Sequence, residues 1–251
     1  MKKQDRWNEI LNIIKIKREV TVEELAEEFN TSLATIRRDL LEMEENSIIT
    51  RFHGGARYNT TRLSEPPMML KSETNARAKQ MVGRYAASLI RDNQLVYIDA
   101  GSATYEMLSY ITAKNITVCT VGIPHINKLV SLGINTIVPG GHVRPSTMAI
   151  TGIKTAQRIS QYYFDVCFIG SNGIHEQMGV TTTNEYEAEV KRAVITHSKK
   201  AYVLSDNTKF NVTYPCSYAS LDEVTIITDS YSNYVGKPIP SIIETDKMTI
   251  L

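Results

Sequence analysis

Beyond residue 75, short apolar runs alternate with stretches of helical spacing, and this alternation constrains the fold more than any other feature. Apolar runs of strand length occur at residues 95–98, 116–121, 136–139, 165–169, 201–204 and 223–228, and helical patterns occur at residues 76–90, 105–111, 124–132, 151–162 and 184–197. Strands that alternate with helices form a parallel sheet, and a strand buried on both faces requires a continuous apolar run. The sequence therefore predicts a Rossmann-like α/β domain over residues 76–251, whose last segment, 238–251, is either an edge strand or a tail.

The first 57 residues have the pattern of a small α+β domain. An apolar stripe at helical spacing runs from Trp7 to Ile14. Thr21 and Glu24 form a capping box at the start of a second helix, and Ser32 is a suitable N-cap for a third. The segment at residues 53–56 contains two glycines that permit a tight turn. We predict a winged helix-turn-helix over residues 1–57, with three helices and a two-stranded wing.

Consecutive prolines at positions 66 and 67 interrupt any helix, so residues 58–75 are predicted to be a linker. A length of 251 residues suits two domains, and 42% hydrophobic with 22% charged residues is typical of a globular protein. No apolar run approaches the roughly 18–20 residues that span a bilayer, and the start of the chain lacks a signal-peptide pattern. We therefore expect a cytoplasmic protein that does not contact the membrane.

The cysteines are few and have no pairing pattern. Cys119, Cys167 and Cys216 include no close pair, so neither a disulfide framework nor zinc spacing is supported. Cys119 and Cys167 lie inside apolar runs, which predicts buried, reduced thiols.

The overall charge gives no general case for nucleic-acid binding, because 28 Lys and Arg residues face 27 Asp and Glu residues. Residues 1–57 contain ten basic and eleven acidic residues. DNA binding must therefore rest on local segregation of charge, with small, hydroxyl and basic residues at the start of the third helix and on the wing. The predicted DNA-contacting residues are Thr21, Ser32, Ala34, Thr35, Arg37, Arg38, Arg51 and His53. The alternative is that these arginines are solvated or paired with neighbouring glutamates.

Polar and glycine residues follow four of the predicted strands, where parallel α/β sheets bind ligands. The small residues from Gly101 to Thr104 lead into a helix, an arrangement that favours phosphate, and glycines elsewhere permit close backbone approach. The candidate effector-binding residues are Asp99, Gly101, Ser102, Ala103, Thr104, Gly140, Gly141, Arg144, Asn172, Gly173, Thr182, Thr183, Glu187, Lys191 and Lys209. Three alternatives remain open: a plain strand-to-helix turn at Gly101, a surface ion pair of ~0.3–0.5 kcal/mol between Glu187 and Lys191, and a structural role for Lys209.

Two N-terminal motifs, TIRRDL at residues 35–40 and HGGA at residues 53–56, resemble the DNA-binding domain of the DeoR family of bacterial repressors. The segments DAGSAT (99–104), PGG (139–141), FDVCFIGSNGI (164–174), GVTTTNEYEAEVKRAVI (179–195) and SDNTKF (205–210) resemble its effector-binding domain. The resemblance implies a sensor similar in fold to ribose-5-phosphate isomerases, a phosphorylated sugar as effector, operator DNA as partner and no cofactor or metal. In this chain Ser102 and Ala103 stand where two threonines are common, and Ala103 lacks the hydroxyl donor.

Two functions follow as hypotheses. The first is a transcriptional regulator, most simply a repressor of a carbohydrate-utilisation operon, which a sugar phosphate releases from DNA. Two half-sites require two reading domains, so a homodimer or tetramer is expected; activation in place of repression stays open. The second is a sugar-phosphate isomerase fused to a DNA-binding module. Ser171 and Asn172 stand where such enzymes carry acidic residues, which leaves Glu187 and Asp206 as candidate bases. We expect the regulator and not an enzyme.

Overall fold

The computed structural model describes residues 3–17, 19–45, 49–58, 71, 74–232 and 234–246. The chain divides into two compact units, residues 1–74 and residues 75–251. The predicted linker at residues 58–75 lies mostly outside the described residues.

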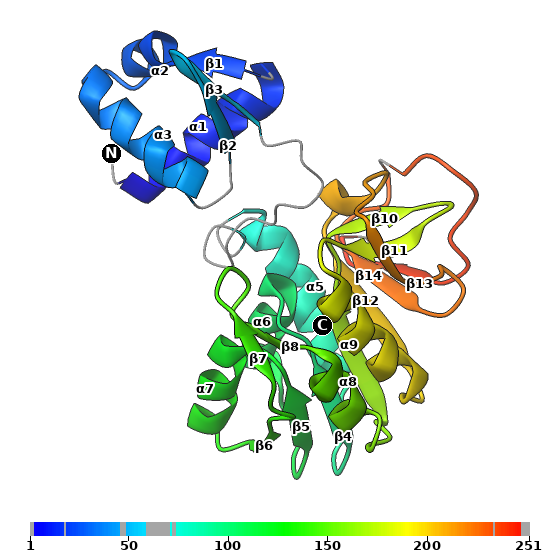
Figure 1. The fold of residues 1–251 in the computed structure, drawn as a ribbon. Coiled ribbons are helices and arrows are strands. Elements are labelled where there is room, and N and C mark those ends of the chain that lie inside the picture. Colours follow the sequence, from blue (N-terminus) through cyan, green and yellow to red (C-terminus); the bar gives the residue numbers. More distant parts are fainter. Residues whose placement is uncertain are drawn as a thin grey trace. The chain divides into compact units, whose positions relative to one another are not determined.

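The described part of the N-terminal unit includes helices α1 to α3 and a three-stranded antiparallel sheet (Figure 1). The elements are α1 (Lys3–Lys17), β1 (Glu19–Thr21), α2 (Val22–Glu28), α3 (Leu33–Glu45), β2 (Ile49–Phe52) and β3 (Gly55–Tyr58). The predicted wing has only two strands, whereas the structure adds β1 beside β3. This pairing depends on Gly55, because a Cβ there would lie 2.3 Å from the carbonyl oxygen of Val20. Gly54 turns the wing at a φ of +87°, a conformation that favours glycine.

The predicted start signals of the second and third helices, α2 and α3, are confirmed. The Glu24 amide donates to Thr21 Oγ1 over 3.1 Å, and the Thr21 amide donates to Glu24 Oε2 over 2.8 Å, which completes the capping box. Ser32 Oγ accepts from the Thr35 amide over 3.1 Å at the start of α3. The inward-facing Ile36 and Leu40 are fully buried in the apolar core of this unit.

A buried ion pair joins α3 to α1. The Arg6 Nε atom donates to Asp39 Oδ2 over 2.5 Å, and Asp39 is fully buried beside Leu40. The hydrogen bond that Arg6 donates to Asp39 raises the pKa of Arg6 above its ordinary value. A buried carboxylate needs such a cation, so this pair fixes the position of α3 against α1.

The larger unit is built on a seven-stranded sheet in the order β15-β14-β12-β9-β4-β5-β6, in which all neighbouring strands are parallel (Figure 1). Its strands are β4 (Leu95–Ile98), β5 (Thr117–Thr120), β6 (Asn135–Ile137), β9 (Val166–Gly170), β12 (Ala201–Ser205), β14 (Thr225–Thr228) and β15 (Ile242–Glu244). Its helices are α5 (Ala76–Ser88), α6 (Ser102–Met107), α7 (Ile123–Ser131), α8 (Ile153–Ile159) and α9 (Glu185–Thr196). The predicted Rossmann-like parallel sheet is therefore confirmed.

Successive side chains along a strand of the sheet pack into two different apolar cores, one on each face. Val96 and Ile98 of β4 pack in one core with residues of α5 and α6, whereas Tyr97 packs in the other with residues of α8 and α9. This alternation follows the strand period of two residues. It explains why a strand buried on both faces reads as a continuous apolar run.

Five short strands are missing from the sequence prediction. They are β7 (His142–Arg144), β8 (Ala149–Thr151), β10 (Gly173–His175), β11 (Gly179–Thr182) and β13 (Cys216–Ala219). They form antiparallel ladders beside the main sheet, and each has only three or four residues, too few to show an alternating pattern.

Some predicted boundaries also change. The helix predicted from residue 151 begins at Ile153, because Thr151 pairs with His142 in the β7–β8 ladder. A short helix begins at Ser102 rather than at residue 105, and a 3-10 turn follows it. Within residues 238–251, Ile242–Glu244 forms the edge strand β15.

Cys119 and Cys167 are buried free thiols, as predicted, and burial raises the pKa of each to about 12. Cys216 is a half-buried free thiol. In the part of the chain that the structure describes, no helix is long and apolar enough to cross a membrane.

We predict that Asp39→Ala lowers the free energy of unfolding of the N-terminal unit by about 3 kcal/mol, because it leaves the Arg6 cation without its buried partner. Trp7 is the single tryptophan and lies buried in this unit, so its fluorescence during urea unfolding of the full chain reports this unit specifically. Glu42→Ala is the matched control. It removes a more exposed pair with Lys3 and should cost less than about 1 kcal/mol. Equal effects of the two changes would show that the Asp39 pair does not hold α3.

Candidate functional site

The start of α3 presents the residue types that were predicted to contact DNA. Ser32, Ala34, Arg37 and Arg38 are exposed, and Thr35 is half-buried. The Ser32 and Thr35 hydroxyls lie 2.9 Å apart, on the first turn of the helix. Small residues there allow close approach to a phosphate backbone, and the first-turn amides have no acceptor within the helix.

The arginines differ in their partners. Arg37 and Arg38 form no ion pair or hydrogen bond with the described part of the chain, so both guanidinium groups are available to DNA. Arg51 on the wing lies 3.9 Å from Glu44, so the alternative of a glutamate-paired arginine holds for this residue. His53 is exposed in the wing turn, and Thr21 is exposed with its hydroxyl committed to the capping box.

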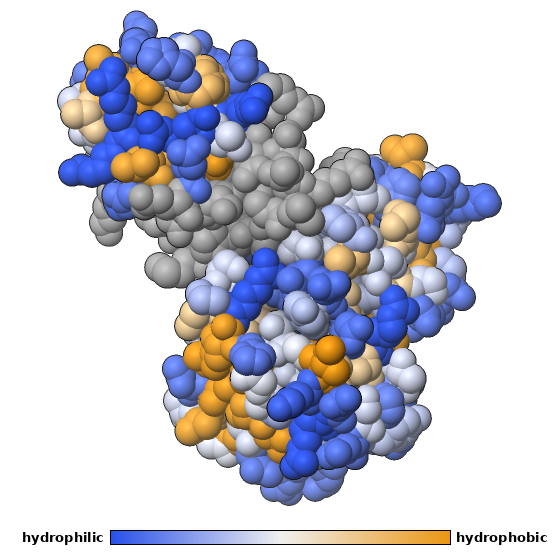
Figure 2. All heavy atoms as spheres, viewed as in Figure 1, coloured by the Kyte–Doolittle hydropathy of each residue, from blue (hydrophilic) through white to orange (hydrophobic). Residues whose placement is uncertain are grey.

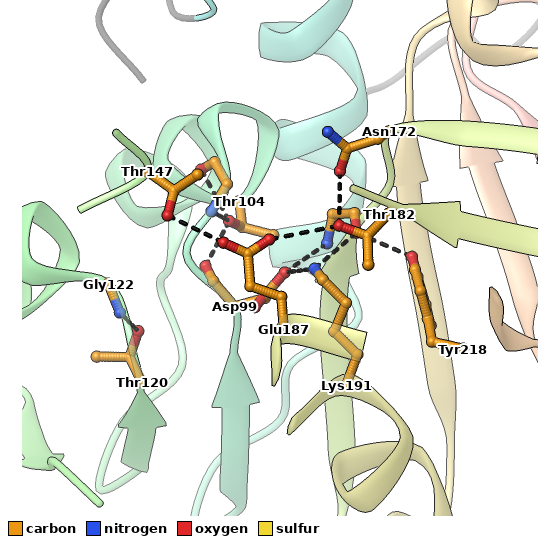
Figure 3. Close-up of polar contacts among 12 residues, drawn as sticks. Asp99, Thr104, Thr120, Gly122, Thr147, Asn172, Thr182, Glu187, Lys191 and Tyr218 are labelled. Atoms are coloured by element: carbon orange, nitrogen blue, oxygen red, sulfur yellow. Dashed lines mark hydrogen bonds and ion pairs between the residues drawn. The ribbon is translucent and has the colours of Figure 1, made fainter. Parts of the chain in front are cut away.

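In the larger unit, the predicted site residues of α9 point into the carboxyl ends of β4 and β9 (Figure 3). Lys191 Nζ pairs with Asp99 and donates to the carbonyl oxygen of Gly170 over 3.0 Å. The Gly170 amide donates to the same Asp99 carboxylate over 3.1 Å. Lys191 also lies over the ring of Tyr218, 5.3 Å from its centroid. Glu187 and Lys191 are both buried, so the alternative of a surface ion pair between these two residues is wrong.

Glu187, one turn before Lys191, gathers a second set of predicted residues. Its Oε1 atom accepts from Thr147 over 3.0 Å and from Arg144 over 3.3 Å. Its Oε2 atom lies 3.3 Å from the Thr182 hydroxyl, which also lies 3.2 Å from Asn172 Oδ1. The fold therefore brings Asp99, Arg144, Asn172, Thr182, Glu187 and Lys191 together at one edge of the sheet, which we call the rim (Figure 3). Thr183 is buried next to Thr182.

A small cavity lies within the rim. Asp99, Thr151, Glu187 and Lys191 contribute to its lining, and its volume is about 20 Å³. A cavity of this size holds about one water molecule. A sugar-sized ligand must therefore bind over the rim or displace side chains of the rim.

The Gly101 turn stands beside Asp99, and its hydroxyl residue faces inward. Thr104 Oγ1 donates to the carbonyl oxygen of Asp99 over 2.6 Å and accepts from the Gly101 amide over 2.9 Å. His125 Nε2 lies 3.1 Å from the same oxygen. Thr104 is fully buried, so its hydroxyl shapes the turn, whereas Ser102 and Ala103 form the first turn of α6.

The contacts of Thr104 determine the tautomer of His125. A hydroxyl has one proton, and the short contact to the Asp99 carbonyl uses it. The proton between Thr104 and His125 therefore belongs to Nε2, and Nδ1 carries a lone pair. Nδ1 has no hydrogen-bond partner among the described residues and packs against Gly122, where a Cβ would lie 2.3 Å away. Burial lowers the pKa of His125 to about 4, so the ring is neutral at neutral pH.

The candidate glycines separate into different roles. A Cβ on Gly141 would lie 2.0 Å from Thr155 Oγ1, and one on Gly173 would lie 2.3 Å from the carbonyl oxygen of Val212. The close approach that these two glycines permit is to the chain itself, so we do not retain them as ligand contacts. Gly140 adopts a φ of +73° in the turn that enters β7, with open space beside it.

Lys209 lies at a second cluster, at the end of β12. Its Nζ atom is 4.0 Å from the buried Asp206 carboxylate. Asn75 also donates to Asp206 over 3.1 Å. Burial opposes ionisation of Asp206, but Lys209 and the Thr208 hydroxyl outweigh it and lower the pKa. The Ser171 and Ser205 hydroxyls, 3.1 Å apart, connect this cluster to the end of β9.

Sequence reasoning missed four contributors: Arg6, Asp39, His125 and Thr147. Asp39 occupies the buried stripe of α3, three residues after Ile36, and that position signals a charge with an internal partner. His125 is likewise four residues before the buried Leu129 on α7. The described residues contain no cluster of three or more metal-ligating side chains.

We predict that His125 makes the stability of the larger unit rise with pH between about 4 and 6.5. The unfolded chain binds a proton on this ring below its ordinary pKa of 6.5, and the folded chain binds it only near 4. The full effect is about 3 kcal/mol, present above pH 6.5 and lost as the pH falls towards 4. His125→Gln should remove this part of the pH dependence in thermal unfolding followed by circular dichroism. His142→Gln, at an exposed site, is the control. If the unfolding temperature changed with pH in the same way in both variants, the burial of a neutral ring would be contradicted.

Two family profiles match this chain. Residues 6–62 match the profile of the DeoR-like helix-turn-helix domain, and residues 74–230 match that of the DeoR C terminal sensor domain. Among solved structures, ribose 5-phosphate isomerase A from Methanocaldococcus jannaschii is similar with a TM-score of 0.41 and 13% identity, over 54% of this chain and 55% of that chain.

The protein relatives are regulators. FruR of Bacillus subtilis, an uncharacterised HTH-type transcriptional regulator, is 36% identical over 90% of this chain and 92% of its own length. The lactose phosphotransferase system repressor of Staphylococcus epidermidis is 30% identical over 97% of this chain and 99% of its own length. The transcriptional repressor GlcR of Bacillus subtilis is 31% identical over 93% of this chain and 91% of its own length. These relatives favour a regulator over an enzyme, as expected, and together with the two domain matches they show that this chain belongs to the DeoR family of transcriptional regulators.

Proposed function

We propose that this protein represses a carbohydrate-utilisation operon and that a phosphorylated sugar, bound at the rim, releases it from its operator. Relatives named as a lactose phosphotransferase system repressor and as the repressor GlcR support repression and the link to sugars. The observation that carries the effector site is the pairing of two buried carboxylates, Asp99 and Glu187, with Lys191 and Arg144 at the carboxyl ends of the strands.

The side chains of the rim suit a ligand with both hydroxyl and phosphate groups. Carboxylates such as Asp99 and Glu187 accept hydrogen bonds from sugar hydroxyls, and Asn172 and Thr182 extend this polar surface. Lys191 and Arg144 supply positive charge, and the first turn of α6 adds amides that favour an anion. Lys209 offers a further cation at the second cluster.

Binding at the rim requires an exchange of partners, since the cavity holds only about one water molecule. We infer that the phosphate group competes with Asp99 and Glu187 for Lys191 and Arg144. A phosphate carries more negative charge than a carboxylate and offers three acceptor oxygens, which favours the exchange. Because both Glu187 and Lys191 belong to α9, the exchange acts on the position of this helix.

Operator binding places α3 in the major groove, with Arg37 and Arg38 at base edges or phosphates. Two half-sites call for a homodimer or a tetramer of the chain. Release requires a ligand that binds the DNA-free conformation better by about 1–3 kcal/mol, which weakens operator affinity about 5- to 150-fold.

For the DNA-binding surface, we expect Arg37→Ala and Arg38→Ala each to weaken operator binding by about tenfold to a hundredfold, equivalent to about 1–3 kcal/mol. The measurement is fluorescence anisotropy with DNA selected from a random pool by the wild-type protein. Arg91→Ala, an exposed arginine of the sensor unit, is the control. Trp7 fluorescence checks that the N-terminal unit stays folded. Unchanged affinity in both variants would place the DNA-binding surface elsewhere.

For the effector site, a panel of sugar phosphates and the corresponding free sugars is screened by thermal shift, and the stabilising compound is then titrated into the protein–DNA complex. We expect Arg144→Ala and Arg144→Gln to retain DNA binding and to need about tenfold or more compound for release, because each removes a cation of the rim and leaves the buried Lys191–Asp99 pair in place. Arg91→Ala again serves as the control. A compound that releases both variants from DNA at the same concentration as the wild type would exclude the rim as its binding site.

A further inference from the structure

A groove runs between α8 and α9 on the side of these helices that faces away from the sheet. Its volume is about 670 Å³. Ala156 of α8 and Ala188 of α9 line it and are buried, and Glu189 and Arg192 of α9 line its exposed side. Ile153 lines this groove with 56% of its surface accessible, and it also lines a neighbouring pocket together with Tyr186, whose surface is 45% accessible. Figure 2 shows a hydrophobic patch surrounded by hydrophilic side chains over this part of the sensor unit.

The two helices carry opposite charges beside this groove. The α8 segment contains Lys154 and Arg158 and no acidic residue, whereas the first half of α9 exposes Glu185 and Glu189. Within the described part of the chain, Lys154, Glu185 and Glu189 form no hydrogen bond or ion pair through their side chains. A basic helix therefore lies next to an acidic helix on one surface, and the charges stay unneutralised by the chain itself.

We propose that this groove is the contact between two copies of the chain, related by a two-fold axis. In such an interface the same patch meets itself, so it must be complementary to its own copy. An axis that passes between α8 and α9 brings Lys154 of one copy towards the partner's Glu189, and the same contact occurs twice. Ile153 and Tyr186 then supply an apolar part of the contact, and the charged side chains lie beside it. This inference rests on the homodimer of the proposed function and names the surface that forms it.

The proposal also gives α9 two roles. Its inner face carries Glu187 and Lys191 of the rim, and its outer face carries Glu185, Glu189 and Arg192 of the groove. One helix diameter, about 10 Å, separates the two faces. Any shift of α9 on ligand binding therefore changes the contact between the copies, and with it the spacing of the two DNA-reading units.

A charge exchange tests the contact. Full-length wild type, Lys154→Glu, Glu189→Lys and the double variant K154E/E189K are compared by sedimentation velocity at low and at physiological ionic strength. Each single change places like charges opposite each other twice, so we expect the dimer Kd to rise about tenfold or more, most strongly at low ionic strength. The double variant reverses both charges and should restore the dimer towards the wild-type Kd. Lys114→Glu, at an exposed lysine whose side chain has no partner among the described residues, should leave the Kd unchanged.

Several results would overturn the proposal. A monomeric wild type would refute the homodimer itself. A wild-type dimer that both single variants leave intact, or a double variant weaker than either, would reject this surface and leave the proposed repressor function standing. A dimer that Leu132→Lys disrupts while the α8 and α9 variants do not would assign the contact to the exposed apolar side chains near α7 and β6 instead. Thermal shift of every variant confirms that it folds.

Discussion

The buried pair of Lys191 and Asp99 is the interaction on which the sensor unit depends. Both side chains are removed from water, so each is stabilised by the other and by the hydrogen bonds of Gly170. The pair joins α9 to the ends of β4 and β9, and thereby sets where Glu187 stands one turn earlier. Because the fold itself needs these charges to be paired, an anion that takes one partner away perturbs the surrounding structure.

The N-terminal unit uses the same device for a different purpose. Asp39 is buried against Arg6, and this holds α3 so that the two preceding residues, Arg37 and Arg38, stay exposed. On the proposed function, the DNA-binding surface is thus defined by charges that have no partner among the described residues and is positioned by charges that have one. An arginine paired within the chain, as Arg51 is with Glu44, contributes less to that surface.

The rim and the α8–α9 groove share α9, which carries the two buried charges on one face and exposed charges on the other. A helix transmits a displacement across its own width without any long chain of contacts. On the proposed function, ligand chemistry at the strand ends and the distance between two reading units are therefore linked through a single element.

The sequence alone determined the two-domain plan, the parallel sheet, the exposed face of α3 and most residues of the rim, because helix and strand periods, caps and strand-end turns are local signals. It missed β1 and the five short antiparallel strands of the larger unit, which lack the continuous apolar runs of buried parallel strands. Only the tertiary structure decided which partner each buried charge takes: Lys191 meets Asp99 across 92 positions and Arg6 meets Asp39 across 33. It also decided that Gly141 and Gly173 accommodate the chain rather than a ligand, because such contacts depend on how distant segments pack.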